Sequence, residues 1–278
     1  MSRTATIPFT IPDERRGLGR IGGAISDGLA LWQRNLIGLR RTPQTLVFST
    51  LQPVIFVLLF RYVFGGAVSQ TLNVPYVDYL MPGIFCQMVV FGAMLTAVGL
   101  AADLKSGMLE RFHSLPMSRS AVLAGRTTAD LTRNFFVVIL VSIVGFIVGF
   151  RIHTNVFGFL AGMALVLLFG YALSWVFATV GLAVGDPETA QAASFPVMAP
   201  LVFASSAFVA VATMPGWLRP FAEHQPVSVT ASAVRALMIG NTTPGTSTAT
   251  YVWQALAWLI LLIVVFAPVA VRQYRKAV

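Results

Sequence analysis

The run MPGIFCQMVVFGAMLTAVGLA at residues 81–101 is followed, one residue later, by DLKSGMLERFHSLPMSRSAVLAGRTTADLTR at residues 103–133. The first run is uncharged and apolar, and it is as long as the roughly 20 residues that a helix needs to cross a bilayer. The second run is basic and amphipathic. An apolar run joined directly to a charged amphipathic segment indicates a membrane span that ends in a functional segment at one membrane face.

The composition of the whole chain supports a membrane protein. Of the 278 residues, 56% are hydrophobic and only 10% are charged, whereas about a quarter of the residues of a soluble domain are charged. The net charge of +9 comes from basic residues beside the apolar runs, as the positive-inside rule describes. This distribution argues against nucleic acid as a partner.

Six apolar segments approach span length, and they predict an all-α polytopic fold with a transmembrane domain over residues 45–271. The expected spans are residues 45–64, 81–101, 119–150, 157–180, 195–213 and 252–271. Fifteen of the nineteen Lys and Arg residues lie in 1–44, 102–133 and 272–278. The positive-inside rule therefore predicts that both chain termini are cytoplasmic.

The segments outside the expected spans differ in character. Residues 1–19 are rich in Pro, Arg, Gly and Thr and are expected to form a mobile cytoplasmic tail. Apolar residues recur every three or four positions over residues 20–42, which is typical of an amphipathic helix lying on membrane lipid. This helix is either a simple anchor or a contact for a partner. Residues 272–278 are expected to form a second cytoplasmic tail.

The charged loop after the second span has its own helical pattern. Leu104, Met108, Phe112 and Leu115 are spaced four, four and three residues apart, so one helical face is apolar. Pro116 is expected to end this helix. Two interpretations follow: a solvated helical hairpin, or a short helix on which a cytosolic ATPase pushes.

The order of residues in this loop resembles the signature region of type-2 ABC exporter permeases, and is most similar to the daunorubicin-resistance kind of drug and lipid exporters. The matching positions are Asp103-Leu104, Gly107, Glu110-Arg111-Phe112, Ser114-Leu115-Pro116-Met117, Arg119, Gly125-Arg126 and Asp130. Further similar blocks are Asp186-Pro187-Glu188-Thr189-Ala190-Gln191, Met214-Pro215-Gly216-Trp217-Leu218 and Gln225-Pro226.

The resemblance implies that residues 103–115 form a coupling helix seated in a groove of a separate ABC ATPase subunit. The expected ATPase contacts are Leu104, Lys105, Met108, Glu110, Arg111, Phe112 and Leu115. It also implies a second permease chain, as a homodimer or a heterodimer, in a bacterial cytoplasmic (inner) membrane. ATP and Mg²⁺ would be bound by the partner ATPase, and no cofactor is expected in this chain.

The chain lacks the sequence of an ATPase. A phosphate-binding loop reads G-x-x-x-x-G-K-[ST], and the nearest string, residues 99–106, has no second glycine. No zinc-protease, thiol-redox or serine-hydrolase motif is present either. We therefore expect no catalytic residue and no metal site, and we interpret the chain as a transport subunit rather than an enzyme.

Two weaker signals concern the pathway and its exit. Gln52 and Gln87 are polar residues within expected spans, and we predict that they line a pathway. Between the last two spans, prolines divide the outer segment into helix-length pieces at 216–224 and 227–239. These pieces are expected to be re-entrant external helices with Trp217 and Phe221 at an external gate, or else a plain surface loop.

The sequence thus predicts the permease subunit of an ATP-driven exporter for an amphipathic drug, lipid or lipid-like metabolite, with a role in multidrug or lipid efflux and antibiotic resistance. One alternative is an ion-coupled carrier, which is disfavoured because no Asp or Glu is expected in the middle of a span. The other is an intramembrane lipid-modifying enzyme, for which the chain supplies no convincing pair of catalytic groups.

Overall fold

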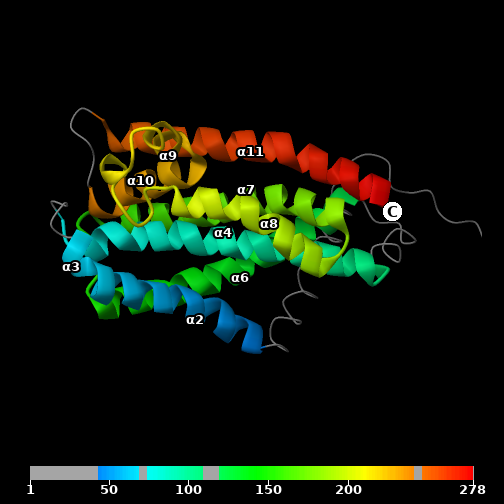
Figure 1. The fold of residues 1–278 in the computed structure, drawn as a ribbon, viewed down its shortest axis with the longest axis horizontal. Helices are drawn as coiled ribbons and strands as arrows, with labels where there is room; N and C mark the ends of the chain where they lie inside the picture. Colours follow the sequence, from blue (N-terminus) through cyan, green and yellow to red (C-terminus); the bar gives the residue numbers. More distant parts are fainter. Residues whose placement is uncertain (1–42, 69–73, 109–118, 241–245, 278) are drawn as a thin grey trace, which may run out of the picture.

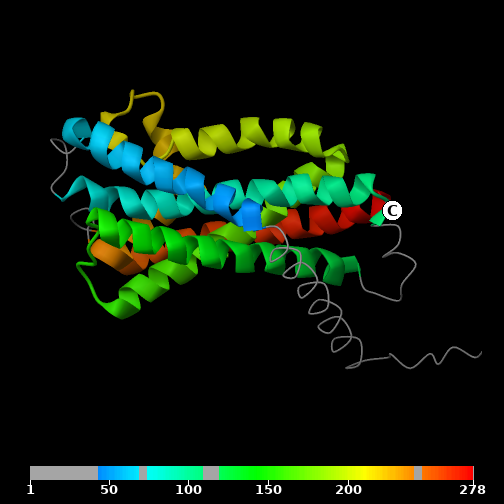
Figure 2. The same ribbon diagram turned by 90° about the horizontal axis from the view of Figure 1, so that it is seen from below.

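The computed structural model describes residues 43–68, 74–108, 119–240 and 246–277. The expected tail 1–19 and amphipathic helix 20–42 lie outside these residues. Within them every regular element is helical, and the long helices run side by side along one axis (Figures 1 and 2). The helices are α2 (Pro43–Leu59), the π-helix η1 (Phe60–Phe64), α3 (Gly65–Val68), α4 (Tyr76–Lys105), α6 (Arg119–Val148), α7 (Val156–Val184), α8 (Pro187–Phe203), the 3-10 helix η3 (Val211–Thr213), α9 (Arg219–His224), α10 (Pro226–Ile239) and α11 (Thr248–Ala277).

Four helices of the described part are long and apolar enough to cross a membrane, so the chain is a multi-pass membrane protein. They are α4, α7, residues 125–148 of α6 and residues 248–276 of α11. The other two expected spans overlap shorter helices: α2, which continues through η1 and α3 to Val68, and α8, which has 17 residues and overlaps the span only in part. The six-span count therefore stays a prediction.

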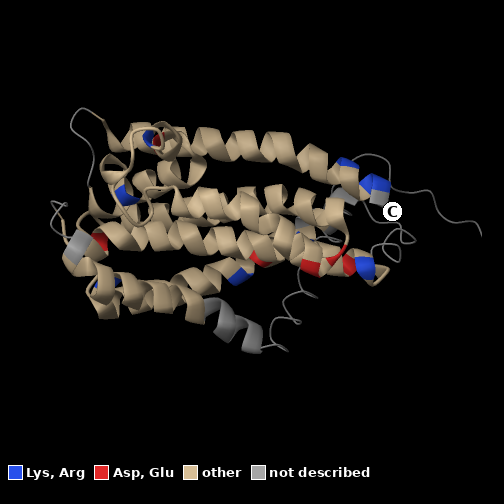
Figure 3. Ribbon diagram, in the orientation of Figure 1, with Lys and Arg blue, Asp and Glu red and all other residues tan. Residues whose placement is uncertain are grey.

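The outward surfaces of these helices carry large apolar side chains. Ile147 of α6 is 79% exposed, Phe157 of α7 is 82% exposed and Val264 of α11 is 64% exposed. Most acidic and basic residues lie toward the two ends of the bundle, although one basic and one acidic segment lie nearer its middle (Figure 3). An apolar belt between charged ends is the surface that a bilayer requires, because a charged side chain at the bilayer centre costs several kcal/mol.

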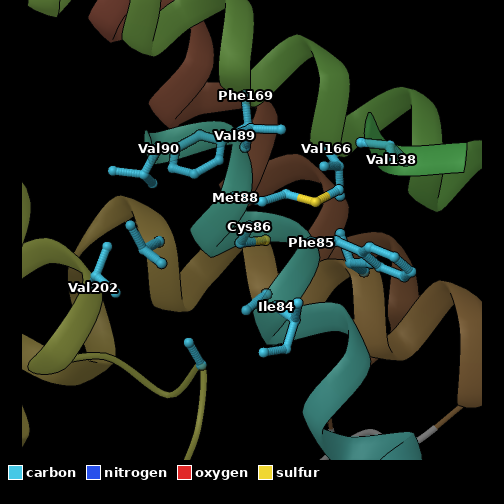
Figure 4. Close-up of a cluster of buried hydrophobic side chains, with 14 of the residues drawn as sticks. Ile84, Phe85, Cys86, Met88, Val89, Val90, Val138, Val166, Phe169 and Val202 are labelled. Atoms are coloured by element: carbon cyan, nitrogen blue, oxygen red, sulfur yellow. The ribbon is translucent and has the colours of Figure 1, made fainter. Parts of the chain in front are cut away.

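Helix α4 is the centre of the bundle and packs against α6, α7, α8 and α10. Its residues Phe85 and Met88 are buried beside Val166 and Phe169 of α7, and Val202 of α8 joins the same cluster (Figure 4). Lipid tails are as apolar as these side chains, so burial from water does not hold the helices together inside a membrane. Their association rests on close packing and interhelical hydrogen bonds.

Glycines allow the closest helix approaches. A Cβ atom on Gly83 of α4 would collide with the backbone of Ala207, in the segment after α8. A Cβ on Gly181 of α7 would collide with the backbone of Ala97 on α4. Small residues at such positions let backbones touch, which is the usual way that membrane helices gain packing energy.

The structure differs from the sequence-based expectation at the fifth span, which was expected at 195–213. Helix α8 begins earlier, because Asp186 caps its first turn by accepting a hydrogen bond from the backbone N–H of Thr189 and Pro187 occupies its first position. The helix also ends earlier, at Phe203. Ser206 and Ala207 instead direct their carbonyl groups to the guanidinium of Arg235 on α10, over 2.6 Å and 3.1 Å.

Arg235 is 4% exposed and fixes the non-helical segment after α8 against the bundle. Its Nε also donates to the carbonyl of Tyr79, and its guanidinium carbon lies 3.8 Å from the centroid of the Tyr79 ring. Four backbone and side-chain acceptors and one aromatic face thus satisfy a buried cation. The short helices α9 and α10 follow at the same end of the bundle (Figure 1).

Candidate transport cavity and its link to the charged end of the bundle

A cavity of about 100 Å³ lies between α2, α4 and α6. Its wall is apolar except for one guanidinium and three carboxamides. The lining residues are Gln52, Pro53, Phe56, Gln87, Met88, Phe91, Gly92, Met94, Leu95, Arg133, Asn134 and Val137. The two glutamines that the sequence singled out for a pathway are therefore neighbours at one cavity, although their role in transport stays a prediction.

The three carboxamides come from three different helices. Gln52 is exposed on α2, Gln87 of α4 is 3% exposed, and Asn134 of α6 is 4% exposed. Asn134 packs closely because Gly92 of α4 and Gly170 of α7 have no Cβ where its amide group lies. None of the three carboxamides hydrogen-bonds to another part of the chain that the structure describes.

The guanidinium at the cavity wall belongs to Arg133. Its Nη2 donates to the carbonyl of Gly92 over 2.7 Å, and its Nη1 lies 3.0 Å from Oδ1 of Asp130, one helical turn away. Asp130 is 5% exposed, and its second oxygen accepts a 2.7 Å hydrogen bond from the hydroxyl of Thr96 on α4. Arg133 and Asp130 thus form a neutral ion pair on α6 that is hydrogen-bonded to Gly92 and Thr96 of α4.

The same network continues toward the charged end of the bundle. Arg126, one turn earlier on α6, has its Nε 4.0 Å from Asp130 and its Nη1 2.7 Å from Asp103 on α4. Gly99 of α4 makes room for this guanidinium, since a Cβ there would collide with Nη2 of Arg126. A continuous line of charged contacts therefore joins the cavity wall to the last turn of α4.

The structure corrects the expected course of the coupling helix, residues 103–115. Asp103, Leu104 and Lys105 belong to the last turn of α4, which ends at Lys105 with Ser106 as its C-cap, and the chain then turns at Gly107. Gly107 has a φ of 68°, a left-handed conformation that favours glycine over any residue with a Cβ. A single helix from residue 104 onward is therefore wrong, because Gly107 breaks it.

A second contact ties this turn to the connection between α7 and α8. Nζ of Lys105 lies 2.7 Å from Oδ1 of Asp186, the residue that caps α8. The hydrogen bond from Lys105, followed by the two from Thr189, lowers the pKa of Asp186 from 3.8 to about 2. Asp186 is therefore fully ionised near neutral pH, and the ends of α4 and α8 are held together electrostatically.

The expected ATPase contacts are only partly described. Leu104 is half-buried and Lys105 is exposed at the end of α4, and Met108 is half-buried just after the turn. The other expected contacts lie outside the described residues: Glu110, Arg111, Phe112 and Leu115. Their role as ATPase contacts stays a prediction.

The residues expected at an external gate lie at the opposite end of the bundle. Trp217 is 81% exposed in the segment before α9, and Phe221 on α9 is 46% exposed. The helices expected at 216–224 and 227–239 correspond in position to α9 and α10. Most residues of α10 are buried against α4, α7 and α11. Gating and a re-entrant placement stay predictions.

Sequence reasoning missed Arg133 and Asn134 as cavity residues, and it missed a buried carboxylate. The sequence predicted no Asp or Glu in the middle of a span; Asp130 lies in the first turns of the membrane-length part of α6, residues 125–148, and is buried there. The spacing of Arg126, Asp130 and Arg133 at intervals of four and three residues was a signal that could have found the network.

Long apolar helices, charged ends and a partly polar cavity between three helices define a multi-pass membrane protein with the features of a transporter. Comparison with known sequences identifies the family: the sequence model of ABC-2 type transporters matches residues 28–239. The chain belongs to the ABC-2 type transporter family.

Individual relatives cover nearly the whole chain. It is 33% identical over 253 residues to the daunorubicin resistance ABC transporter permease protein DrrB1 of Streptomyces coeruleorubidus, covering 91% of this chain and 87% of that protein. It is 24% identical over 249 residues to the probable doxorubicin resistance ABC transporter permease protein DrrC of Mycobacterium tuberculosis, covering 90% and 86%. The putative transport permease ycf38 of Cyanophora paradoxa is 26% identical over 218 residues, covering 77% and 74%.

Proposed function

We propose that this chain is the membrane subunit of an ATP-driven exporter that moves an amphipathic drug, lipid or lipid-like metabolite out of a bacterial cell. Membership of the ABC-2 type transporter family supports a transport subunit. The relatives named for resistance to daunorubicin and doxorubicin support an amphipathic drug as cargo. Hydrolysis of ATP with Mg²⁺ is assigned to a separate ABC ATPase subunit.

The observation that carries this proposal is the line of charged contacts from the cavity to the end of α4. Arg133 at the cavity wall contacts Asp130, and Arg126 contacts Asp103 three residues before the turn at Ser106. Networks of ion pairs and hydrogen bonds between packed helices can carry coupling between distant sites, so this line supports a connection between the charged end of the bundle and the cavity.

The mechanism follows from this connection. Closure of the ATPase on ATP displaces residues 103–115 and pulls on the end of α4 through the turn at Gly107. Because Asp103 forms an ion pair with Arg126, α6 moves with α4 at this end of the bundle. The cavity between the two helices then changes shape. The spans then switch access from the cytoplasmic side to the external side, where Trp217 and Phe221 are proposed to form the gate.

The proposed assembly contains the ATPase, a second permease chain and surrounding lipid, in a bacterial inner membrane. Arg272, Arg275 and Lys276 of α11 lie at the same end of the bundle as Lys105 (Figures 1 and 3). This common basic end supports a cytoplasmic side that includes the C-terminus. The second chain is either another copy of this one or a different permease.

Co-purification followed by reconstitution tests the proposal. The ATPase that co-purifies with the chain from its native host is reconstituted with it in proteoliposomes, and ATP-dependent movement of daunorubicin is followed by fluorescence. The substitutions Glu110→Ala and Arg111→Ala together should leave basal ATPase activity but abolish most transport. Unchanged transport and assembly in this variant would refute the coupling assignment, and failure of any ATPase to co-purify would refute the exporter.

One observation, the buried carboxylate of Asp130, favours an ion-coupled carrier. Carriers driven by protons or sodium usually need a carboxylate within the membrane. Asp130, however, is already paired with Arg133 and accepts a hydrogen bond from Thr96, so we favour a structural role. Transport that persists without ATP and collapses when a proton or sodium gradient is removed would support the carrier instead.

A further inference from the structure

Two of the three carboxamides at the cavity, Gln87 and Asn134, are buried without partners among the described residues. A carboxamide has one acceptor oxygen and two N–H donors, and leaving such groups buried and unsatisfied costs on the order of 1–3 kcal/mol each. Gln87 and Asn134 are almost fully buried, yet neither hydrogen-bonds to a described residue. Both residues line the cavity, so water or the polar group of a ligand there can hydrogen-bond to Gln87 and to Oδ1 of Asn134, whereas the buried Nδ2 of Asn134 lies beside Gly170 of α7.

The cavity wall carries no unbalanced charge toward a ligand. Arg133 is neutralised by Asp130, and its Nη2 is already donated to the carbonyl of Gly92. Both oxygens of Asp130 are likewise engaged, by Arg133 and by Thr96. A cationic ligand would meet no free carboxylate, and an anionic ligand would compete with a carboxylate that is already in place.

The remaining wall is apolar and polarisable. Phe56, Phe91, Met88 and Met94 supply two aromatic rings and two thioethers, which adapt to flat or irregular apolar ligands. A volume of about 100 Å³ accommodates several waters or one small polar group of a ligand. It is too small for the whole of a drug-sized molecule, because sites for such molecules measure about 300–1,000 Å³.

We propose that this cavity binds an uncharged polar group of an apolar molecule, such as a hydroxyl, ketone, ester or carboxamide, through Gln52, Gln87 and Asn134. This inference rests on the proposed function, because the bound molecule is taken to be cargo. Binding itself needs neither ATP nor transport. The exposed side chain of Gln52 marks where the rest of the molecule extends out of the cavity.

Photolabelling of the full chain with its ATPase in nanodiscs tests this proposal. The probe is benzophenone, an apolar ketone that reacts with nearby C–H bonds under ultraviolet light, and peptide mass spectrometry locates the label. The expected label is on α2, α4 or α6 at the cavity, including Met88 or Met94. Labelling confined to other surfaces would overturn the proposal.

Competition by three molecules of similar shape identifies the chemistry. At equal concentrations in the membrane, diphenylmethanol, which donates and accepts hydrogen bonds, should compete roughly five- to tenfold better than diphenylmethane, which does neither. The anion 2-benzoylbenzoate should compete no better than diphenylmethane. Equal competition by diphenylmethanol and diphenylmethane, or the strongest competition by the anion, would overturn the proposal.

Variants tie the preference to the carboxamides. Gln87→Leu and Asn134→Leu should each remove most of the advantage of diphenylmethanol, and if one does not fold the other suffices. Thr230→Val is the matched control, because the Thr230 hydroxyl is also buried without a partner among the described residues but lies on α10, away from this cavity. Loss of the preference in Thr230→Val as well would overturn the assignment to the carboxamides.

Two further comparisons are needed. The first distinguishes a membrane lipid from cargo as the ligand, and the second distinguishes failure of the binding site from failure of the proposed function. Stronger labelling in ether-linked lipids, which lack ester carbonyls, would identify a lipid ester as the occupant of the same polar site. Unchanged labelling would exclude a lipid ester from the site. If the preference for diphenylmethanol is preserved but no ATP-dependent transport is found, the exporter is refuted and the binding site stands. If transport is found without this preference, only the binding site is refuted.

Discussion

Arg126 on α6 and Asp103 on α4 form an ion pair with 2.7 Å between Nη1 and Oδ2. The two side chains are only 22% and 25% exposed, so this pair is less screened by solvent than a surface pair. Asp103 also lies in the helical turn that ends at Ser106, whose hydroxyl donates to the Asp103 carbonyl. The pair therefore fixes the end of α4 to α6.

Replacing Asp103 with Asn should weaken this connection without removing the polar group. We expect a loss of stability on the order of 1 kcal/mol and a larger loss of transport, because the end of α4 can then move without α6. The measurements are the thermal midpoint of the purified protein and the ratio of transported substrate to ATP hydrolysed. Lys276→Gln, which removes an exposed charge on α11, is the control. An unchanged transport ratio in Asp103→Asn would exclude a coupling role for the pair.

Replacing Asp130 with Asn should lower stability more than replacing Asp103 with Asn. Asp130→Asn leaves the guanidinium of Arg133, whose side chain is 11% exposed, without its anion, and breaking a buried pair costs about 3–5 kcal/mol. Asp130→Asn combined with Arg133→Gln should recover part of this loss, because neither charge is then left alone. Chemical denaturation of the single and double variants measures the coupling energy. Additive losses would show that the two charges do not stabilise each other.

Length and composition were sufficient to predict the long helices. A run of about 20 apolar residues has few stable arrangements in a bilayer other than a spanning helix, and α4, α7 and α11 follow this rule. The same reasoning singled out Gln52 and Gln87, since a polar group in such a run needs a partner or a cavity. The structure places both at one cavity.

The cavity residues Arg133 and Asn134 were not predicted because they depend on how two helices lie against each other. The expected span 119–150 begins at Arg119, as α6 does, and includes Arg133, but nothing in the sequence indicates that Arg133 lies beside Gly92 of α4. Asp103 and Arg126 are 23 residues apart on different helices, so no local spacing reveals their contact. The start of α8 was predictable in principle, because Asp186-Pro187 is a helix-start signal.

The close approach of Gly83 to Ala207 predicts a position that tolerates no added methyl group. A Cβ on Gly83 would overlap the carbonyl group and Cα of Ala207, which are backbone atoms held by Arg235. We expect Gly83→Ala to lower the free energy of unfolding by about 1–3 kcal/mol. Gly216→Ala is the control, because nothing lies within 4 Å of a Cβ built there. Equal thermal midpoints for the two variants would show that the backbone shifts freely at this contact.

Asp186 has two separable roles, which two substitutions distinguish. Asp186→Asn keeps an oxygen to accept from the backbone N–H of Thr189 but loses the ion pair with Lys105, whereas Asp186→Ala loses both. Asp186→Ala should therefore have the lower thermal midpoint.

Because the folded state lowers the pKa of Asp186 from 3.8 to about 2, its ionised form contributes stability that is fully present above about pH 4 and is lost as the pH falls toward 2. The difference between the native protein and Asp186→Asn should stay constant from pH 7 to 5, shrink between pH 4 and 2, and also decrease with added salt. A difference that instead disappears between pH 7 and 5 would mean that another group, and not this carboxylate, responds to pH.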